Sequence, residues 1–530
     1  MHQALVTSSA WLALAAPLSM VAVALAAAAQ PGPDPRKVLA AARVATGASL
    51  TSAVAAAIGV AIFGPMVTPL AGAGGAGLSL RLDALSVVML SLIAFLGAVV
   101  LEYSRHYLDG DSRHGAFVGR LAAALAAVST LVLSGNLFQL WLFWFLTSLA
   151  LHRLLLFYPG RAPAVVAARK KFVVARAGDV ALAVAALALA HGYGTTDIGL
   201  LNERAAAGAA PLLPLAALLV VVTAALKSAQ FPTHGWLAEV METPTPVSAL
   251  LHAGILNGGT FLVARLAPTL MPVDAASTAM VVIGGSTALF ASVVMTTQPT
   301  IKGALAYSSA AHMGFMMLLC GIGAHSVAIV HLVGHSCYKA HAFLSSGSTV
   351  ETARASRIPA REPNPTAVRV ALGLGLAGLV VIALAVAAGA PLGKDPVQAG
   401  LAAMLALGVG HLVVRGSASP RLLASAVAAA AVVATAFYGL ETAGAHLLGA
   451  VLPHGLEPSP ATLLAMSAVI AFFAATVVAQ QVLPFGASSP RWAVAWVHAR
   501  NGLYANAWFD RMVGALHPIA ARSASPEVNG

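Results

Sequence analysis

Charged residues are scarce in this chain. Of its 530 residues, 29 are basic and 18 are acidic, whereas soluble domains of this total length would carry about 130 charged side chains. So few charges cannot cover several water-exposed domains. Because 59% of the residues are hydrophobic, intrinsic disorder is excluded as well. The composition therefore predicts a polytopic membrane protein.

Cysteine is also nearly absent. Cys320 and Cys337 both lie in apolar runs, which excludes a disulfide framework and a CxxC site. The sequence has no glycine-rich phosphate loop, haem motif or nucleophile motif beyond chance, so we expect no enzyme active site, metal or cofactor in this chain. The net charge of +11 is typical of basic cytoplasmic loops in a membrane protein and does not indicate nucleic-acid binding.

Fifteen apolar runs are each about long enough to span a bilayer. We therefore expect an all-α protein with about 14–15 transmembrane helices and no soluble domain between them. The first run has no basic segment before it and is expected to be a retained helix, not a cleaved signal peptide. The runs lie near 10–29, 46–66, 82–101, 116–134, 136–157, 172–192, 211–231, 247–267, 275–296, 301–322, 324–346, 367–391, 397–414, 421–441 and 461–482.

Basic residues follow odd-numbered spans, and the loops after even-numbered spans carry few of them. By the positive-inside rule this predicts a cytoplasmic C-terminus and an N-terminus on the outer side of a bacterial inner membrane. The basic residues are Arg36, Lys37, Arg43, Arg153, Arg161, Arg169, Lys170, Lys171, Arg354, Arg357, Arg361, Arg415 and Arg421. After the last span, residues 491–518 interleave aromatic residues with Arg and His, which fits either an interfacial amphipathic helix or a docking surface for a partner.

Ionisable residues inside spans cost roughly 2.5–3.5 kcal/mol each and so mark ion paths or internal pairs. Lys227 ends a long apolar run, and prolines and glycines follow it as far as Pro246. That pattern predicts a broken helix beside protein or a water-filled cavity. Glu239 and Glu242 are the nearest acids in sequence and are expected to support Lys227. The alternative is a lysine that snorkels from a helix end.

A second group is His331, His335 and Lys339, whose spacing of four places them on one face of a helix over about 12 Å. We interpret this row as a proton relay. Satisfied core histidines are one alternative. A metal shared by the two histidines is another, although the segment offers no third ligand and Lys339 is a poor neighbour for a cation.

Three further features accompany these groups. His252 follows the Lys227 break directly and is assigned to the relay, whereas His312 stands in another span and is expected to be a packing residue. Lys394 and Asp395 again combine a lysine with Gly and Pro at the end of an apolar run, although Lys394 is equally compatible with an ordinary loop.

The two lysine breaks, at Lys227 and Lys394, suggest that spans 4–8 and 9–13 are copies of one five-helix unit. Arg176 and Asp179, three residues apart, are expected to form a local ion pair that orients span six. We divide the chain into N-terminal helices (1–115), a first repeat (116–267), a second repeat (268–415), C-terminal helices (416–485) and an amphipathic cytoplasmic tail (486–530).

Four segments resemble the antiporter-like family that includes subunit 5 of respiratory NADH dehydrogenase and the multisubunit cation/proton antiporters. They are ARKKFVVARAGDVALA around Arg176, KSAQFPTHGWLAEVMETPTPVSALLHAG from Lys227, IKGALAYSSAAHMGF from Ile301 and HLVGHSCYKAHAFLSSGS from His331. The resemblance implies an antiporter-like fold with two inverted five-helix repeats. It also implies that Lys227, His252, His331, His335 and Lys339 lie on the proton path, with Lys394 matching only weakly.

Other segments are similar to one branch, the DabB-like membrane subunits of DAB-type inorganic carbon accumulation complexes. They are TSLALHRLLLFY, HAGILNGG, KAHAFLSSGS and RNGLYANAWFDR. This resemblance implies passage of H+ or Na+ through the chain. It also implies a large soluble DabA-like partner that resembles a β-carbonic anhydrase and holds zinc, so that CO2 is hydrated to bicarbonate in one direction.

One departure separates the chain from the respiratory pumps. They carry a glutamate in span five that pairs with the lysine of span seven, and this sequence has Phe145 there. The leading hypothesis is thus the energy-coupling subunit of a carbon accumulation complex. The alternatives are a subunit of a respiratory-type complex or multisubunit antiporter, and a passive membrane anchor for a soluble enzyme.

Overall fold

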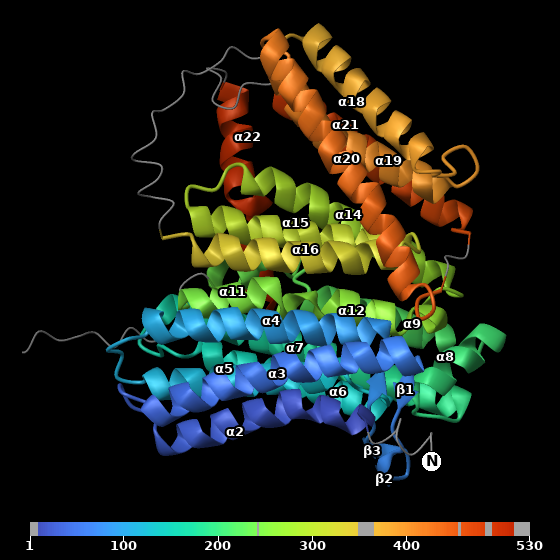
Figure 1. Ribbon diagram of the computed structural model, residues 1–530. Helices are drawn as coiled ribbons and strands as arrows, with labels where there is room; N and C mark the ends of the chain where they lie inside the picture. The colour runs from blue at the N-terminus through green and yellow to red at the C-terminus, as the bar shows by residue number, and fades with distance from the viewer. Residues whose placement is uncertain (1–8, 241–242, 348–364, 454–456, 483–489, 514–530) are drawn as a thin grey trace, which may run out of the picture.

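The computed structural model describes residues 9–240, 243–347, 365–453, 457–482 and 490–513 (Figure 1). Among these residues, 13 helices are long and apolar enough to cross a membrane. Two of the expected spans fall outside that set: α9 (Leu213–Lys227) is short, and α16 (His325–Leu344) carries the histidine row. Each of the fifteen apolar runs nevertheless coincides with helical structure, which confirms the all-α membrane fold.

The remaining helices follow in chain order. They are η1 (Leu12–Leu14), α2 (Ala15–Ala29), α3 (Arg36–Phe63), α4 (Ala84–Tyr107), α5 (His114–Val132), α6 (Leu137–Leu155), α7 (Ala162–Tyr193), α8 (Ile198–Ala207), α10 (Gly235–Glu239), α11 (Thr245–Ala253), η3 (Ile255–Asn257), α12 (Gly258–Arg265), α13 (Ala267–Leu270), α14 (Asp274–Met295), α15 (Ile301–Gly321), α18 (Ala367–Ala387), α19 (Pro396–Gly416), α20 (Pro420–Leu448), α21 (Pro460–Val482), α22 (Pro490–Arg500), η4 (Gly502–Tyr504) and α23 (Ala505–Val513).

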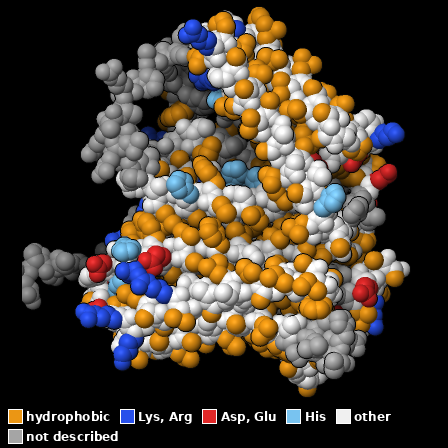
Figure 2. All heavy atoms as spheres, in the orientation of Figure 1, with side chains coloured by type: hydrophobic (Ala, Val, Ile, Leu, Met, Phe, Trp, Pro, Cys, Tyr) orange, Lys and Arg blue, Asp and Glu red, His pale blue; other side chains and the backbone are white. Residues whose placement is uncertain are grey.

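The helices form two groups. Helices α2 to α16 lie roughly parallel in stacked layers, and α18 to α21 are inclined to them, with α20 running down onto α16 (Figure 1). Hydrophobic side chains cover most of the face in Figure 2, and charged side chains gather near helix ends. This is the distribution expected where lipid contacts the middle of the helices.

Helices α14 and α15 approach each other very closely at two glycines. A Cβ added to Gly314 would lie 2.6 Å from the carbonyl oxygen of Gly284, and one added to Gly284 would lie 2.5 Å from the carbonyl oxygen of Gly314. Since hydrophobic attraction between helices is weak in lipid, small residues that allow close backbone packing hold membrane helices together. This contact fixes α15 against α14 and thereby positions the side chains of α15 toward α16.

The predicted break after Lys227 is present. Helix α9 ends at Lys227, and the chain re-enters helical structure through the short α10 and then through α11, η3 and α12. Side-chain hydroxyl groups form hydrogen bonds with backbone groups that the break leaves without helical partners. Phe231 N donates to Thr287 Oγ1 at 3.0 Å, and Ser228 Oγ donates to the carbonyl oxygen of Leu256 at 3.1 Å. Such compensation is required for non-helical backbone at membrane depth.

Four short strands between α3 and α4 were not predicted from the sequence. Strand β1 (Met66–Val67) pairs with β4 (Arg81–Leu82), and β2 (Ala71–Ala73) pairs with β3 (Ala76–Leu78), both antiparallel. All four segments are too short to show an alternating pattern, and β2 and β3 are also rich in Gly and Ala.

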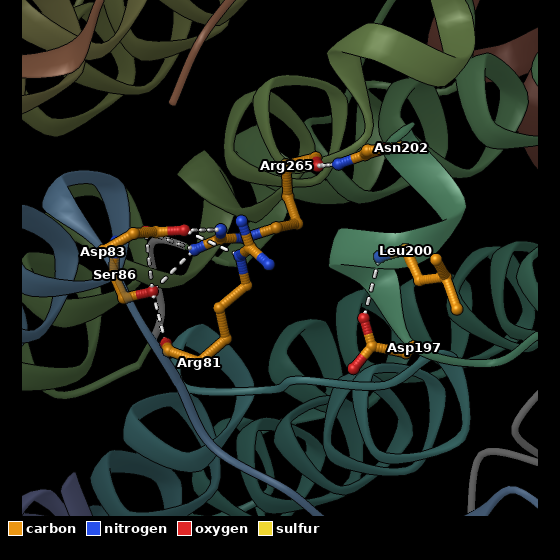
Figure 3. Close-up of polar contacts among 7 residues, drawn as sticks. All are labelled: Arg81, Asp83, Ser86, Asp197, Leu200, Asn202 and Arg265. Carbon is orange, nitrogen blue, oxygen red and sulfur yellow. Dashed lines mark hydrogen bonds and ion pairs between the residues drawn. The ribbon is translucent and has the colours of Figure 1, made fainter. Parts of the chain in front are cut away.

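Asp83, directly after β4, is the N-cap of α4 and joins the strands to α12 (Figure 3). Arg265 donates to both carboxylate oxygens of Asp83, at 2.5 and 3.1 Å, although the two residues are 182 positions apart. Arg81 Nε adds a third contact at 2.9 Å. Although burial by itself raises the pKa of Asp83, the neighbouring Arg265 guanidinium outweighs burial and holds that pKa below its ordinary value.

The described part of the tail docks on this same chain. Asp510 of α23 lies 2.5 Å from Lys170 Nζ of α7, and Asn506 donates to Glu239 of α10 at 2.6 Å. Phe509 between them is 2% exposed. Helix α23 thus packs on α7 and α10 of its own chain, and both roles predicted for the tail, an interfacial helix or a docking surface for a partner, stay predictions. Residues 514–518 of that prediction lie outside the described residues.

Candidate functional site

Lys227 is buried at the end of α9. Its Nζ lies 4.5 Å from the centroid of the Trp144 ring on α6, a cation–π contact. Within the described residues, Nζ has no hydrogen-bond partner. A lysine held in this way is available to exchange a proton with a group that approaches it.

The acid beside Lys227 is Asp179 of α7, which interacts electrostatically with it. The expectation for Glu239 is corrected, because Glu239 Oε1 lies 2.5 Å from Lys170 Nζ and pairs with that lysine instead. The turn after α9 places α10 against α7, where Lys170 lies. Glu242, the other expected acid, lies outside the described residues.

Arg176 and Asp179 form the predicted ion pair within α7, at 2.7 Å. The same guanidinium lies over the ring of Phe145 on α6, with its carbon 4.3 Å from the ring centroid. Arg176 therefore occupies the space beside position 145, and Asp179 is the carboxylate of this cluster.

Two buried lysines were missed by the sequence reasoning, which placed Lys170 and Lys171 in a cytoplasmic loop. Both lie in α7 and are less than 5% exposed. Lys171 Nζ donates to the carbonyl oxygen and to Oγ of Ser148, at 2.7 and 2.8 Å. The apolar run begins after these residues in the sequence, so only a helix that starts earlier than the run, as α7 does, brings them inside.

The next groups link the broken segment to α16. His252 is fully buried, stacks on Phe343 of α16 with ring centroids 4.5 Å apart, and interacts electrostatically with Lys339. Asn257, the last residue of η3, donates to Ser336 Oγ at 2.8 Å. Asn257 and Ser336 were also not predicted, because an isolated Asn or Ser in an apolar run gives no distinct signal.

The row on α16 continues from Lys339 to the histidines. Lys339 is fully buried, and its Nζ donates to the carbonyl oxygen of Leu305 at 3.0 Å. One and two turns earlier lie His335 and His331. His312 of α15 meets them, with Nδ1 3.0 Å from His331 Nε2. The expectation that His312 is a separate packing residue is therefore wrong, because the close packing of α15 on α16 brings it into the row.

Two cavities share Glu441 of α20, and one of them borders the end of this row. One, of about 490 Å³, is lined by the three histidines and by Glu441 of α20. The other, of about 470 Å³, is lined by Lys394, Asp395 and again Glu441. Glu441 thus borders both the histidine group and the Lys394–Asp395 group, which the sequence analysis treated as separate. It was missed because α20 lies far from both in sequence.

Lys394 lies in the connection between α18 and α19 and is exposed. The alternative of a loop lysine is the correct one, although its loop borders a cavity. Asp395 is the N-cap of α19, where its carboxylate accepts from Val397 N at 2.8 Å. Glu441 Oε1 accepts from Gln398 Nε2 at 2.6 Å on the same cavity wall.

Comparisons with known proteins show the family and the fold of the chain. Residues 134–362 match the family model of NADH:quinone oxidoreductase/Mrp antiporter transmembrane proteins, and residues 72–118 match the N-terminus of chain 5 of NADH-ubiquinone oxidoreductase (complex I). The chain also resembles two solved structures in fold. These are the Mrp complex from Dietzia sp., with TM-score 0.57 and 23% identity over 96% of this chain and 57% of that one, and an archaeal membrane-bound sulfane sulfur reductase, with TM-score 0.58 and 16% identity over 96% of both chains.

Three curated relatives make the family assignment more specific. The chain is 35% identical to the probable inorganic carbon transporter subunit DabB2 of Halothiobacillus neapolitanus over 453 residues, which cover 84% of this chain and 82% of that protein. It is 41% identical to the corresponding DabB subunit of Hydrogenovibrio crunogenus over 52% of this chain and 54% of that one. It is 36% identical to NAD(P)H-quinone oxidoreductase chain 5 of Synechocystis sp. over 51% and 40%. A match of this length and identity shows the family: the chain belongs to the DabB-like membrane subunits within the group that also contains complex I chain 5 and the Mrp antiporter subunits.

Proposed function

We propose that this chain translocates an ion, H+ in the first instance, as the membrane subunit of an inorganic carbon accumulation complex. The observation that carries the proposal is the series of buried ionisable residues that runs across the helices. It begins with Lys227, continues through His252 and Lys339 to the histidines of α16, and ends at the cavities beside Glu441.

The free-energy cost of burying these ionisable residues supports a transport role for the series. Several of its members are buried without hydrogen-bond partners among the described residues, namely Lys227 Nζ and both ring nitrogens of His252 and His335. Unsatisfied ionisable groups at membrane depth are expensive, and a passive anchor would gain nothing from them. Groups that must take up and release a proton, by contrast, need a free site.

The coupling to carbon chemistry is the second part of the proposal. The relatives named as inorganic carbon transporter subunits support it. A large soluble DabA-like zinc subunit, resembling a β-carbonic anhydrase, would hydrate CO2 to bicarbonate, and ion flow through this chain would make that step one-way. The zinc of that hydration reaction would be the partner's, and this chain would sit in the bacterial inner membrane.

The test is growth of a carbonic-anhydrase-deficient host in air when this chain is expressed with its partner. Lys227→Ala and Lys339→Ala should leave assembly of the complex intact and abolish rescue, while Lys37→Ala, at an exposed position on α3, should rescue fully. Full rescue by both buried-lysine variants would overturn the relay.

A second candidate function is cation/proton exchange in a respiratory-type or multisubunit antiporter complex. The 36% identity to NAD(P)H-quinone oxidoreductase chain 5 favours considering it. It predicts co-purification with several small membrane subunits and pH-dependent Na+ or K+ exchange in membrane vesicles. Co-purification with a single large zinc protein would instead select the carbon function.

A further inference from the structure

Three histidines converge at the interface of α15 and α16. His312, His331 and His335 each offer a ring nitrogen, and these atoms all lie within 4.8 Å of one another. His335 is 5% exposed, and neither of its nitrogens has a hydrogen-bond partner among the described residues. Packing alone does not account for three imidazoles gathered here with so few acceptors.

The spacing approaches that of a tetrahedral metal site. With Zn–N bonds of about 2.0–2.1 Å, neighbouring ligand atoms of a tetrahedral site lie roughly 3.3 Å apart. His312 Nδ1 and His331 Nε2 are already 3.0 Å apart. His331 and His335 are four residues apart on one helix, the spacing by which helical histidines share a zinc ion. His335 offers the third nitrogen, within 4.8 Å of the other two.

We propose that His312, His331 and His335 form a binding site for a divalent transition metal, with Zn2+ the ion that fits the ligand set best. Neutral imidazole nitrogens suit zinc, copper, iron and nickel, whereas Mg2+ and Ca2+ require oxygen ligands. The third ligand, which the α16 segment lacks, comes from α15.

The surroundings leave one coordination position open. The three histidines line the cavity of about 490 Å³, which leaves room for a fourth ligand. Figure 2 shows histidine side chains reaching the surface at the level of α16. Glu441 lines the same cavity and offers a carboxyl group on the side of α20.

The side chain of the neighbouring Lys339 does not occupy the metal site. Lys339 lies one turn beyond His335, and its Nζ donates to the carbonyl oxygen of Leu305. The metal site does not rest on the proposed function, since it needs only these side chains. Because a coordinated nitrogen accepts no proton, a metal ion bound here would interrupt proton transfer through these histidines, and the relay would operate only in the metal-free state.

The site is tested with Co2+ as a spectroscopic probe of the purified full-length chain in detergent, with its affinity tag removed. The background is Cys337→Ser, since the Cys337 thiol is exposed and would bind the probe elsewhere. We expect one Co2+ per chain, with the absorption bands of tetrahedral cobalt, and displacement by Zn2+. His312→Gln, His331→Gln and His335→Gln should each abolish the bands.

His325→Gln is the matched control. His325 lies buried on the same α16, but its Nδ1 contacts the carbonyl oxygen of Gly323 at 3.1 Å and it lies outside the cluster. This variant should keep the bands unchanged. Bands that persist in all three cluster variants, or a parent chain that takes up no Co2+, would overturn the site. If the cluster variants fail to fold, X-ray absorption of Zn2+ bound to the parent chain decides: three imidazole ligands support the site and fewer refute it.

Discussion

The guanidinium of Arg176 lies over the ring of Phe145, its carbon 4.3 Å from the ring centroid. Position 145 is where the resemblance to respiratory pumps leads one to expect a glutamate that serves Lys227. Here the aromatic ring holds Arg176 in place, and Asp179 on the next turn of α7 carries the negative charge. In this chain the acid that interacts with Lys227 therefore comes from α7.

Asp179→Asn is expected to impair function far more than Glu239→Gln. Asp179 interacts electrostatically with three cations, Arg176, Lys227 and Lys171, and its loss would leave them facing one another in a medium of low dielectric. We expect ion-driven bicarbonate uptake to fall about tenfold or more, equivalent to at least about 1.4 kcal/mol. Equal uptake by the two variants would show that Asp179 is not the partner of Lys227.

A carboxylate at position 145 is expected to compensate for that loss. Phe145→Glu combined with Asp179→Asn would place an acid where Arg176 now covers the ring, close to the same cations. Uptake by the double variant should recover a substantial part of the activity lost in Asp179→Asn alone. Phe145→Gln in the same background is the control and should give no recovery, because it adds no charge.

Asp83→Asn is expected to destabilise the fold by about 3–5 kcal/mol, because it leaves the buried Arg265 without its counter-charge. The measurement is the apparent Tm in detergent. Asp34→Asn is the control, since the Asp34–Arg36 pair is largely exposed and should shift the Tm very little.

The pH dependence of this effect has a defined sign. Because the pKa of Asp83 is lowered from 3.8, the pair contributes its full stability above that value and loses it as the pH falls through the lower folded-state pKa. The Tm difference between the parent chain and Asp83→Asn should therefore persist down to about pH 4 and shrink only on further acidification. A difference that disappears between pH 7 and pH 5 would contradict this assignment.

Gly314→Ala is expected to destabilise the chain by about 1–3 kcal/mol, the usual cost of overpacking. Its new Cβ would lie 2.6 Å from the Gly284 carbonyl oxygen and 2.7 Å from Ala288 N, and backbone atoms in packed helices cannot move aside cheaply. Gly375→Ala in α18, with nothing within 4 Å of its added Cβ, should be neutral or slightly stabilising. Unfolding in a denaturing detergent compares the two variants.

Asp510→Ala is expected to loosen α23 from the membrane helices. Removing this carboxylate takes away one of the two acids on the buried Lys170, and an interaction with a charged group is worth about 1.5–3 kcal/mol. Hydrogen exchange of the Ala505–Val513 amides should become about tenfold faster or more. Arg511→Ala, at an exposed neighbouring position, should leave their exchange unchanged.

The sequence by itself determined the membrane class, the approximate positions of the apolar helices, the break after Lys227 and the Arg176–Asp179 pair. Each of these follows from local properties: the length of an apolar run, prolines that interrupt a helix, or two charges one turn apart. The pairing of Glu239 with Lys170 could not be found in this way, because α10 meets α7 only after a turn whose direction the sequence does not specify.

Only the tertiary structure decided which distant groups meet. His312 reaches His331 across two helices, Arg265 reaches Asp83 across 182 positions, and Glu441 borders the cavities of both the histidines and Lys394. These contacts depend on helix packing, which is set by side-chain shape and close glycine contacts along whole interfaces and not by any short motif. The sequence thus marks which residues are costly to bury, and the packing of the helices determines which of them share a site.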